Sequence, residues 1–144
     1  MQIAGLAIPY GVPNSYNETF TPDTLDGGNL KGYLKSLSGL PMFWDHDPDW
    51  RAGWWTDFDS TPSGLYVRGL VADDGIIERI KRTPDAKRKL SVTYGMWGTR
   101  NMRRTERVIR NGVYEPITIG QATLAEISIV ESPAWKESFY QVIA

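Results

Sequence analysis

Residues 121–132, QATLAEISIVES, carry the pattern that decides the fold. Apolar side chains alternate there with small or polar ones, and Pro133 ends the run. This alternation predicts a strand, whose successive side chains point to opposite faces of a sheet. One predicted face holds Ala125, Ile127 and Ile129, and the other holds Leu124, Glu126, Ser128 and Val130. Glu126 is therefore a carboxylate inside an apolar strand, and it requires a partner because buried charges are seldom left unpaired.

Further strands are predicted along the chain, separated by turn residues. They fall within residues 2–11, 18–20, 39–46, 52–60, 64–72 and 89–97. Asn111-Gly112 lies between two β-prone runs and is a strong short-range signal for a hairpin within residues 104–120.

Two segments predict helices instead. Residues 29–38 carry apolar side chains at helical spacing. Residues 73–82 begin with acids and end with bases, which suits the helix dipole, and Thr83-Pro84 should end that helix. The whole pattern predicts one β-rich α+β domain over residues 1–144, an antiparallel barrel or curled sheet of about seven strands with roughly two outer helices.

The composition fits one globular domain without disulfides. The chain has 144 residues, of which 41% are hydrophobic and 23% are charged. The lack of cysteine excludes disulfides, thiolate metal sites and a cysteine nucleophile. No apolar run approaches the roughly 20 residues that cross a bilayer. The N-terminus lacks the basic start and long apolar core of a signal peptide. The lack of cysteine leaves the redox compartment open, and a cytoplasmic protein is the simpler expectation.

Charge is unevenly distributed along the chain. Residues 78–110 hold eleven Lys and Arg against three Asp and Glu, whereas the net charge is −1. Such asymmetry permits an anionic partner, so a noncatalytic nucleic-acid- or capsid-binding module is an alternative function. Because the arginines match no known reader motif, we favour a solvated basic edge and expect no nucleic-acid partner.

The single histidine, His46, is the natural partner for Glu126. An imidazole held by a carboxylate on one nitrogen can take a proton from a hydroxyl through the other. In the predicted strand at residues 89–97, Ser91 and Thr93 share the face opposite Leu90, Val92 and Tyr94. The chain therefore offers His46, Ser91 and Glu126, in that order, as a candidate triad.

Each of these residues also has an ordinary structural interpretation. A lone histidine after a strand is commonly a surface residue, and a strand serine is commonly a small polar residue. Glu126 could instead pair with one of the arginines.

A metal site is a further alternative for residues 45–50, DHDPDW. The Asp spacing resembles the start of a calcium loop, but Trp50 stands where that loop requires Gly, and Thr56 stands where it requires Glu. One histidine and no cysteine also disfavour zinc. We therefore predict no metal and no cofactor.

Tryptophans suggest a carbohydrate-binding β-domain as another class. Trp50, Trp54 and Trp55 could form a stacking platform. Trp54 and Trp55 must point to opposite faces of a strand, so at most one of them joins a platform and the other packs in the core.

The whole chain resembles the prohead protease family of tailed bacteriophages, serine proteases with a fold like that of herpesvirus assemblins. The resemblance is carried by GLAIPYG (5–11), ETFTPDTLDG (18–27), FWDHDPDWRAGWW (43–55), GLYVRGLV (64–71), KLSVTYG (89–95) and LAEISIVESPAW (124–135). The third of these is similar to the family's histidine motif, the fifth to its serine motif, and the last to its closing motif. The second has Asp23 where the family usually has Gly.

The resemblance implies a Ser-His-Glu endopeptidase with His46 as general base, Ser91 as nucleophile and Glu126 as the orienting acid. Thr93 departs from the family pattern, which usually has Gly at that position, and puts the geometry near the nucleophile in question. The implied substrates are scaffold segments of the major capsid protein and the protease's own chain, cleaved inside the prohead in the host cytoplasm. Family members often dimerise, so a homodimer is possible, and no membrane partner is expected.

Overall fold

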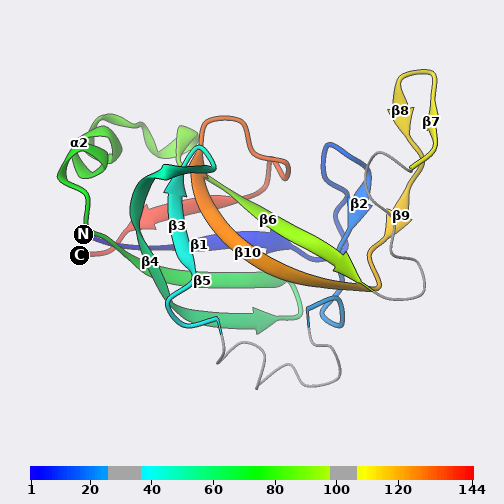
Figure 1. Ribbon diagram of the computed structural model, residues 1–144, viewed down its shortest axis with the longest axis horizontal. Coiled ribbons are helices and arrows are strands. Elements are labelled where there is room, and N and C mark those ends of the chain that lie inside the picture. The colour runs from blue at the N-terminus through cyan, green and yellow to red at the C-terminus, as the bar shows by residue number, and fades with distance from the viewer. Residues whose placement is uncertain (26–36, 98–106) are drawn as a thin grey trace.

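The computed structural model describes residues 1–25, 37–97 and 107–144, and its main element is a curled seven-stranded sheet. The strand order is β11-β1-β5-β4-β3-β10-β6 (Figure 1). The strands are β1 (Gln2–Pro9), β3 (Pro41–Trp44), β4 (Asp47–Thr61), β5 (Gly64–Val71), β6 (Lys89–Trp97), β10 (Gln121–Val130) and β11 (Phe139–Val142). All neighbours are antiparallel except β3 and β10, which run parallel.

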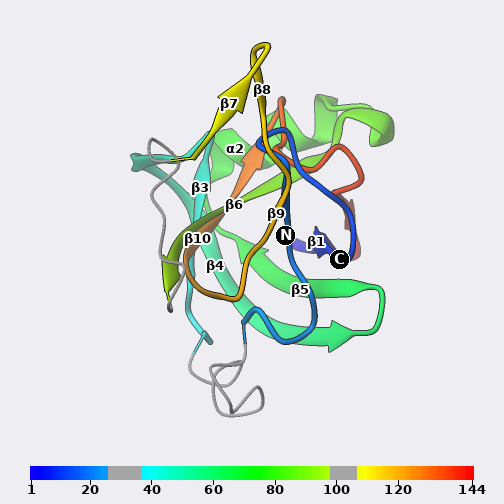
Figure 2. The ribbon, with the colours of Figure 1, turned by 90° about the vertical axis from the view of Figure 1, so that its right-hand side faces the viewer.

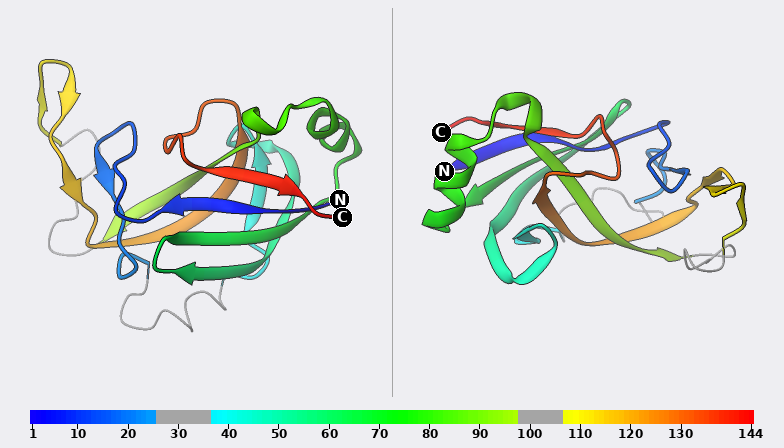
Figure 3. Two further views of the ribbon diagram at one scale, coloured as in Figure 1. Left: turned by 180° about the vertical axis from the view of Figure 1, so that it is seen from behind. Right: turned by 90° about the horizontal axis from the view of Figure 1, so that it is seen from above.

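The sheet curls until its first and last strands approach each other. The Tyr140 amide of β11 donates to the Arg88 carbonyl just before β6, at 3.2 Å. Ser138, between β10 and β11, exchanges hydrogen bonds with both backbone groups of Leu90 in β6. The view from above in Figure 3 shows β6 and β10 passing across the other strands. The fold is thus a half-barrel, which confirms the predicted curled sheet.

Two small sheets complete the β structure. β2 (Glu18–Thr19) pairs in parallel with β9 (Ile117–Thr118), and β7 (Ile109–Arg110) pairs with β8 (Val113–Tyr114). The β7–β8 turn is Asn111-Gly112, both with positive φ, so the predicted hairpin is confirmed. It projects from the body of the molecule (Figure 2).

One α-helix, α2 (Asp74–Arg82), is present among the described residues. Asp73 caps it by accepting a hydrogen bond from the Ile76 amide, and Ile76 and Ile80 bury its inner face. A short 3-10 turn, η1 (Asp85–Lys87), follows. The helix predicted at residues 73–82 is confirmed. The helix predicted at residues 29–38 falls mostly within residues 26–36, outside the described residues.

The core lies inside the curl and is rich in aromatic residues. Its largest fully buried side chains are Trp55, Trp135, Tyr140 and Phe20. Trp55 is fully buried whereas Trp54 is 38% exposed, as strand alternation requires. The expectation that one of these two tryptophans packs in the core is therefore confirmed. No helix in the described part of the chain is long and apolar enough to cross a bilayer.

β11 is the strand that sequence analysis missed. It pairs with β1 at the sheet edge and brings the two termini together, with the Gln2 amide 2.7 Å from the Ala144 carbonyl (Figure 3). Because it is a short edge strand, its sequence carries little alternation.

Candidate active site

A row of polar side chains lies on one face of the β6–β10 ladder. Ser91 is directly opposite Ser128, and Thr93 is directly opposite Glu126. Directly paired residues in an antiparallel ladder share a face, so these four form one polar patch. Their neighbours on the two strands, among them Val92 and Ile127, pack in the core instead.

A β-bulge at Ala125 makes this arrangement possible. Leu124 pairs with Tyr94 and Glu126 pairs with Thr93, so β10 has one extra residue between them. The bulge puts Leu124 on the core face and leaves Ala125 exposed. The prediction that Leu124 shares a face with Glu126, and Ala125 with Ile127, was therefore wrong, because regular alternation does not anticipate an inserted residue.

His46 is delivered by the tight turn between β3 and β4. Trp44 pairs with Asp47, leaving Asp45 and His46 as a two-residue loop with φ of 53° and 61°. The β7–β8 turn has the same form but ends in glycine, which adopts positive φ without strain. A histidine there costs about 1 kcal/mol or more, and such strain tends to persist at functional sites. The Asp45 amide anchors the turn to β10 by donating to the Ile129 carbonyl at 2.8 Å.

The turn brings His46 against Glu126. His46 Nδ1 lies 2.5 Å from Glu126 Oε1, between residues 80 apart in the chain. An ionised carboxylate can only accept hydrogen bonds, so Nδ1 carries the proton and Nε2 of the neutral ring is an acceptor. The His46 side chain is 38% exposed and that of Glu126 is 8% exposed. The acid is thus buried behind a base that solvent can reach.

Two hydroxyl groups complete the environment of the carboxylate. Thr93 donates to Glu126 Oε1 and also lies 3.2 Å from His46 Nδ1, while Ser128 donates to Glu126 Oε2. Sequence analysis placed Thr93 and Ser128 on the faces of Ser91 and Glu126 but gave them no role. Thr93 follows Ser91 by two residues, and Ser128 follows Glu126 by two residues. In a strand this spacing puts each hydroxyl on the same face as its neighbour, and it is the signal that could have identified them.

These contacts set the charges of the pair. Burial raises the pKa of Glu126, but the hydrogen bonds from His46, Ser128 and Thr93 outweigh it, and the pKa lies below its ordinary value of 4.5. The hydrogen bond to Glu126 raises the pKa of His46 above 6.5, against the opposing effect of burial. The pair therefore favours an anionic carboxylate with an imidazole of increased basicity.

Ser91 lies on the same face but is not hydrogen-bonded to His46. It is buried, and Oγ accepts a hydrogen bond from the Ala134 amide at 3.4 Å. Among the described residues nothing accepts the Ser91 hydroxyl proton, whereas Thr93 and Ser128 both donate to Glu126. Ser91 is thus the hydroxyl in this patch whose proton remains uncommitted.

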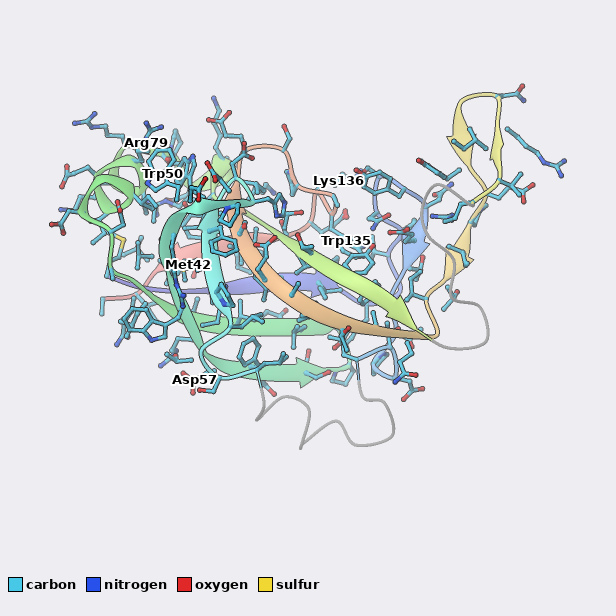
Figure 4. All side chains as sticks on the ribbon, in the orientation of Figure 1. Met42, Trp50, Asp57, Arg79, Trp135 and Lys136 are labelled. Atoms are coloured by element: carbon cyan, nitrogen blue, oxygen red, sulfur yellow. The ribbon has the colours of Figure 1, made fainter. Side chains whose placement is uncertain are left out.

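Ala134 belongs to a well-anchored loop between β10 and β11. Its carbonyl accepts from the Ser15 amide at 2.9 Å. The next residue, Trp135, is buried, packs edge-on against Phe20 and donates from its indole to the Val12 carbonyl at 2.7 Å. Figure 4 shows Trp135 beside β6. The Ala134 amide is therefore held rigidly next to Ser91.

Comparison with known proteins gives a family from the sequence and a fold from the structure. The sequence matches the family described as Caudovirus prohead serine protease over residues 1–144. No curated protein sequence gives a significant match.

Solved structures of the protease of Kaposi's sarcoma-associated herpesvirus share the fold. One, in complex with a hexapeptide phosphonate inhibitor, is 13% identical with a TM-score of 0.55, covering 99% of this chain and 65% of that one. Two others, in complex with allosteric inhibitors, have TM-scores of 0.51 at 12% and 15% identity. They cover 96% and 99% of this chain, and 73% and 76% of those chains. The chain thus spans about two thirds to three quarters of the length of the herpesvirus proteins. At 12–15% identity, this likeness shows a shared fold and nothing more.

Proposed function

Because the chain belongs to the Caudovirus prohead serine protease family, a family of capsid maturation proteases, we propose that its catalytic triad is Ser91, His46 and Glu126. The observation that carries this assignment is the short Nδ1 contact of His46 with the buried Glu126, beside the uncommitted hydroxyl of Ser91. Residues 1–144 then form the protease domain.

In the proposed mechanism, Ser91 Oγ attacks the scissile carbonyl carbon while His46 Nε2 accepts the hydroxyl proton. Glu126 keeps Nδ1 protonated and stabilises the imidazolium that forms. The carbon–nitrogen bond then breaks, the leaving amine takes the proton from Nε2, and an acyl-enzyme remains. Water repeats the cycle and releases Ser91.

The attack requires Ser91 Oγ and His46 Nε2 to come within about 2.6–3.2 Å. Catalytic hydrogen bonds are often long in free enzymes and tighten when substrate binds. Rotation of the Ser91 side chain away from the Ala134 amide would serve this step. It would also leave that amide free to donate to the developing oxyanion, a contact typically worth about 3–4 kcal/mol.

The family also suggests where the protease acts. The proposed substrates are scaffold segments of the major capsid protein and the protease's own chain, and the proposed location is the interior of the prohead. Cleavage by an enzyme enclosed with its substrate would depend on the local concentration inside the shell.

Labelling with a serine-reactive fluorophosphonate, followed by mapping of the modified residue, tests the triad. The wild-type chain should be labelled at Ser91, and Ser91→Ala and His46→Ala should each lose labelling and cleavage of a capsid-scaffold substrate. Ser38→Ala, which changes an exposed serine in a turn, is the matched control. Cleavage by a folded Ser91→Ala protein, with folding checked by circular dichroism, would refute the assignment.

A further inference from the structure

A pocket with a positively charged lining opens next to the candidate active site. It has a volume of about 590 Å³ and lies between α2, η1 and the ends of β3 and β10. Val130, in its wall, is the next residue after Ser128 on the polar face of β10, and Trp44 precedes the His46 turn by one residue. Two residues along a strand span about 7 Å, so an extended peptide held at Ser91 would reach the pocket within two or three residues.

Three cations line this pocket: Arg79, Arg82 and Lys87. The described residues offer no carboxylate partner to any of them. Two neighbouring cations on the same segments, in contrast, are paired: Lys81 with Glu78 at 3.3 Å and Arg88 with Asp85 at 2.9 Å. The unpaired cations are thus those that face the pocket, where Glu131 is the one acid in the lining.

Arg79 is held in place without using its hydrogen-bond donors. Its guanidinium carbon lies 4.7 Å from the ring centroid of Trp50 and 5.5 Å from that of Trp44. Figure 4 shows Trp50 and Arg79 together at the α2 end of the sheet. Stacking on indole faces fixes the plane of a guanidinium while its N–H edges remain available for a carboxylate.

From these observations we propose that the pocket is a specificity subsite for an acidic side chain of the substrate, within three residues of the scissile bond. Arg79 supplies the oriented contact, and Arg82 and Lys87 add charge that favours an anion. Glu131 limits the preference, because it places one like charge beside the bound carboxylate. This subsite rests on the proposed peptidase function.

The test uses peptidyl phosphonate probes that differ only in Glu or Gln at one of the three positions nearest the phosphorus. At one position, the Glu probe should modify Ser91 about tenfold faster than the Gln probe at low salt, and the ratio should fall as salt screens the charges. Arg79→Gln combined with Arg82→Gln removes the oriented contact and one of the two added charges, and should bring the ratio close to one. Lys81→Gln, on the same helix but outside the pocket, should leave it unchanged, and Glu131→Gln should raise it.

The outcomes separate the subsite from the proposed function. Labelling of Ser91 with equal Glu and Gln rates at every position, or a Glu preference that survives the double substitution, would overturn the subsite and leave the peptidase assignment intact. If no probe modifies Ser91, the peptidase assignment fails. The subsite is then decided by titrating the same Glu and Gln peptides into Ser91→Ala protein and following tryptophan fluorescence, where equal affinities would overturn it.

Discussion

Glu18 and Glu126 are two buried carboxylates that meet β6 from opposite sides. Tyr94 donates to Glu18, while Thr93, the preceding residue, donates to Glu126. Both acids also have a basic partner distant in the chain. They differ in what that partner is, and this difference separates a structural ion pair from a candidate catalytic one.

Arg107, the partner of Glu18, is permanently charged and almost completely buried. Its guanidinium donates to Glu18 Oε2 at 3.2 Å and to the carbonyls of Tyr16 and Glu115, so several of its donors are occupied. Such a pair fixes β2 against the segment before β7 and has no proton to exchange. His46, in contrast, carries an imidazole that can gain and lose a proton, and it is partly open to solvent. A buried carboxylate thus becomes useful for acid–base chemistry when its partner can lose a proton and can be reached.

Among substitutions that distinguish the two buried acids, Glu126→Gln should have the largest effect on activity. The amide keeps the shape of the side chain but cannot hold Nδ1 protonated or stabilise the imidazolium. We expect kcat to fall by roughly 10⁴-fold, as for loss of the acid in other serine triads, with the fold retained. Single-turnover cleavage of a capsid-scaffold peptide measures it. A loss smaller than tenfold would mean that Glu126 does not orient the base.

Glu18→Gln should have the opposite signature. It leaves the buried Arg107 without a counter-charge, which typically lowers the free energy of unfolding by about 3–5 kcal/mol. Activity per folded molecule should stay within about threefold of wild type. Urea denaturation measures the loss, and Glu115→Gln is the control, because the exposed Glu115–Arg110 pair is worth about 0–1 kcal/mol. An equal effect of both substitutions would contradict the structural role of Glu18.

Thr93→Val should give a smaller loss of activity. It removes one donor from Glu126 and keeps the β-branched shape, and hydrogen bonds to charged groups contribute about 1.5–3 kcal/mol. We expect kcat to fall by roughly tenfold or somewhat more, and the pKa of Glu126 to rise because a hydrogen bond that lowers it is lost. Thr93→Ser should restore both values. Failure of the serine to restore them would indicate that packing alone explains the valine variant.

A smaller effect concerns the pH dependence of activity, which is measured first on the wild-type chain. A neutral His46 is required as base and its pKa is raised, so kcat/KM should fall with an inflection above pH 6.5 as the solution is acidified. The Glu126→Gln variant should move that inflection toward 6.5. His46 is the only histidine, so its NMR titration can be followed without assignment. An inflection at or below 6.5 in the wild type would count against the pairing.

The same pair should stabilise the fold in a defined pH window. A raised pKa means that the His46 contribution to stability is complete below about 6.5 and is lost as pH rises through the folded-state pKa. A lowered pKa means that the Glu126 contribution is complete above about 4.5 and is lost as pH falls through its folded-state pKa. Urea denaturation across this range should show the pair's contribution greatest between these limits. In Glu126→Gln that contribution should be absent.

Local signals predicted the elements that depend on neighbouring residues. Asn111-Gly112 specified its hairpin because both residues tolerate positive φ. Residues 73–82 specified a helix through acids at its start and bases at its end, which suit the helix dipole. The bulge at Ala125 and the edge strand β11 could not be predicted in this way, because each depends on the strand that it faces.

By itself, the sequence determined which chemical groups are available: one imidazole, a carboxylate within an apolar strand, and hydroxyls at alternate positions of two strands. Only the tertiary structure decided which of them meet. The Asp45-His46 turn, anchored on β10, closes an interval of 80 residues to a 2.5 Å contact. The register of β6 on β10 adds Thr93 to the same acid. The physical reason is that residue types and strand periodicity are local properties, whereas the distance between side chains is set by register, bulges and curl across the whole sheet.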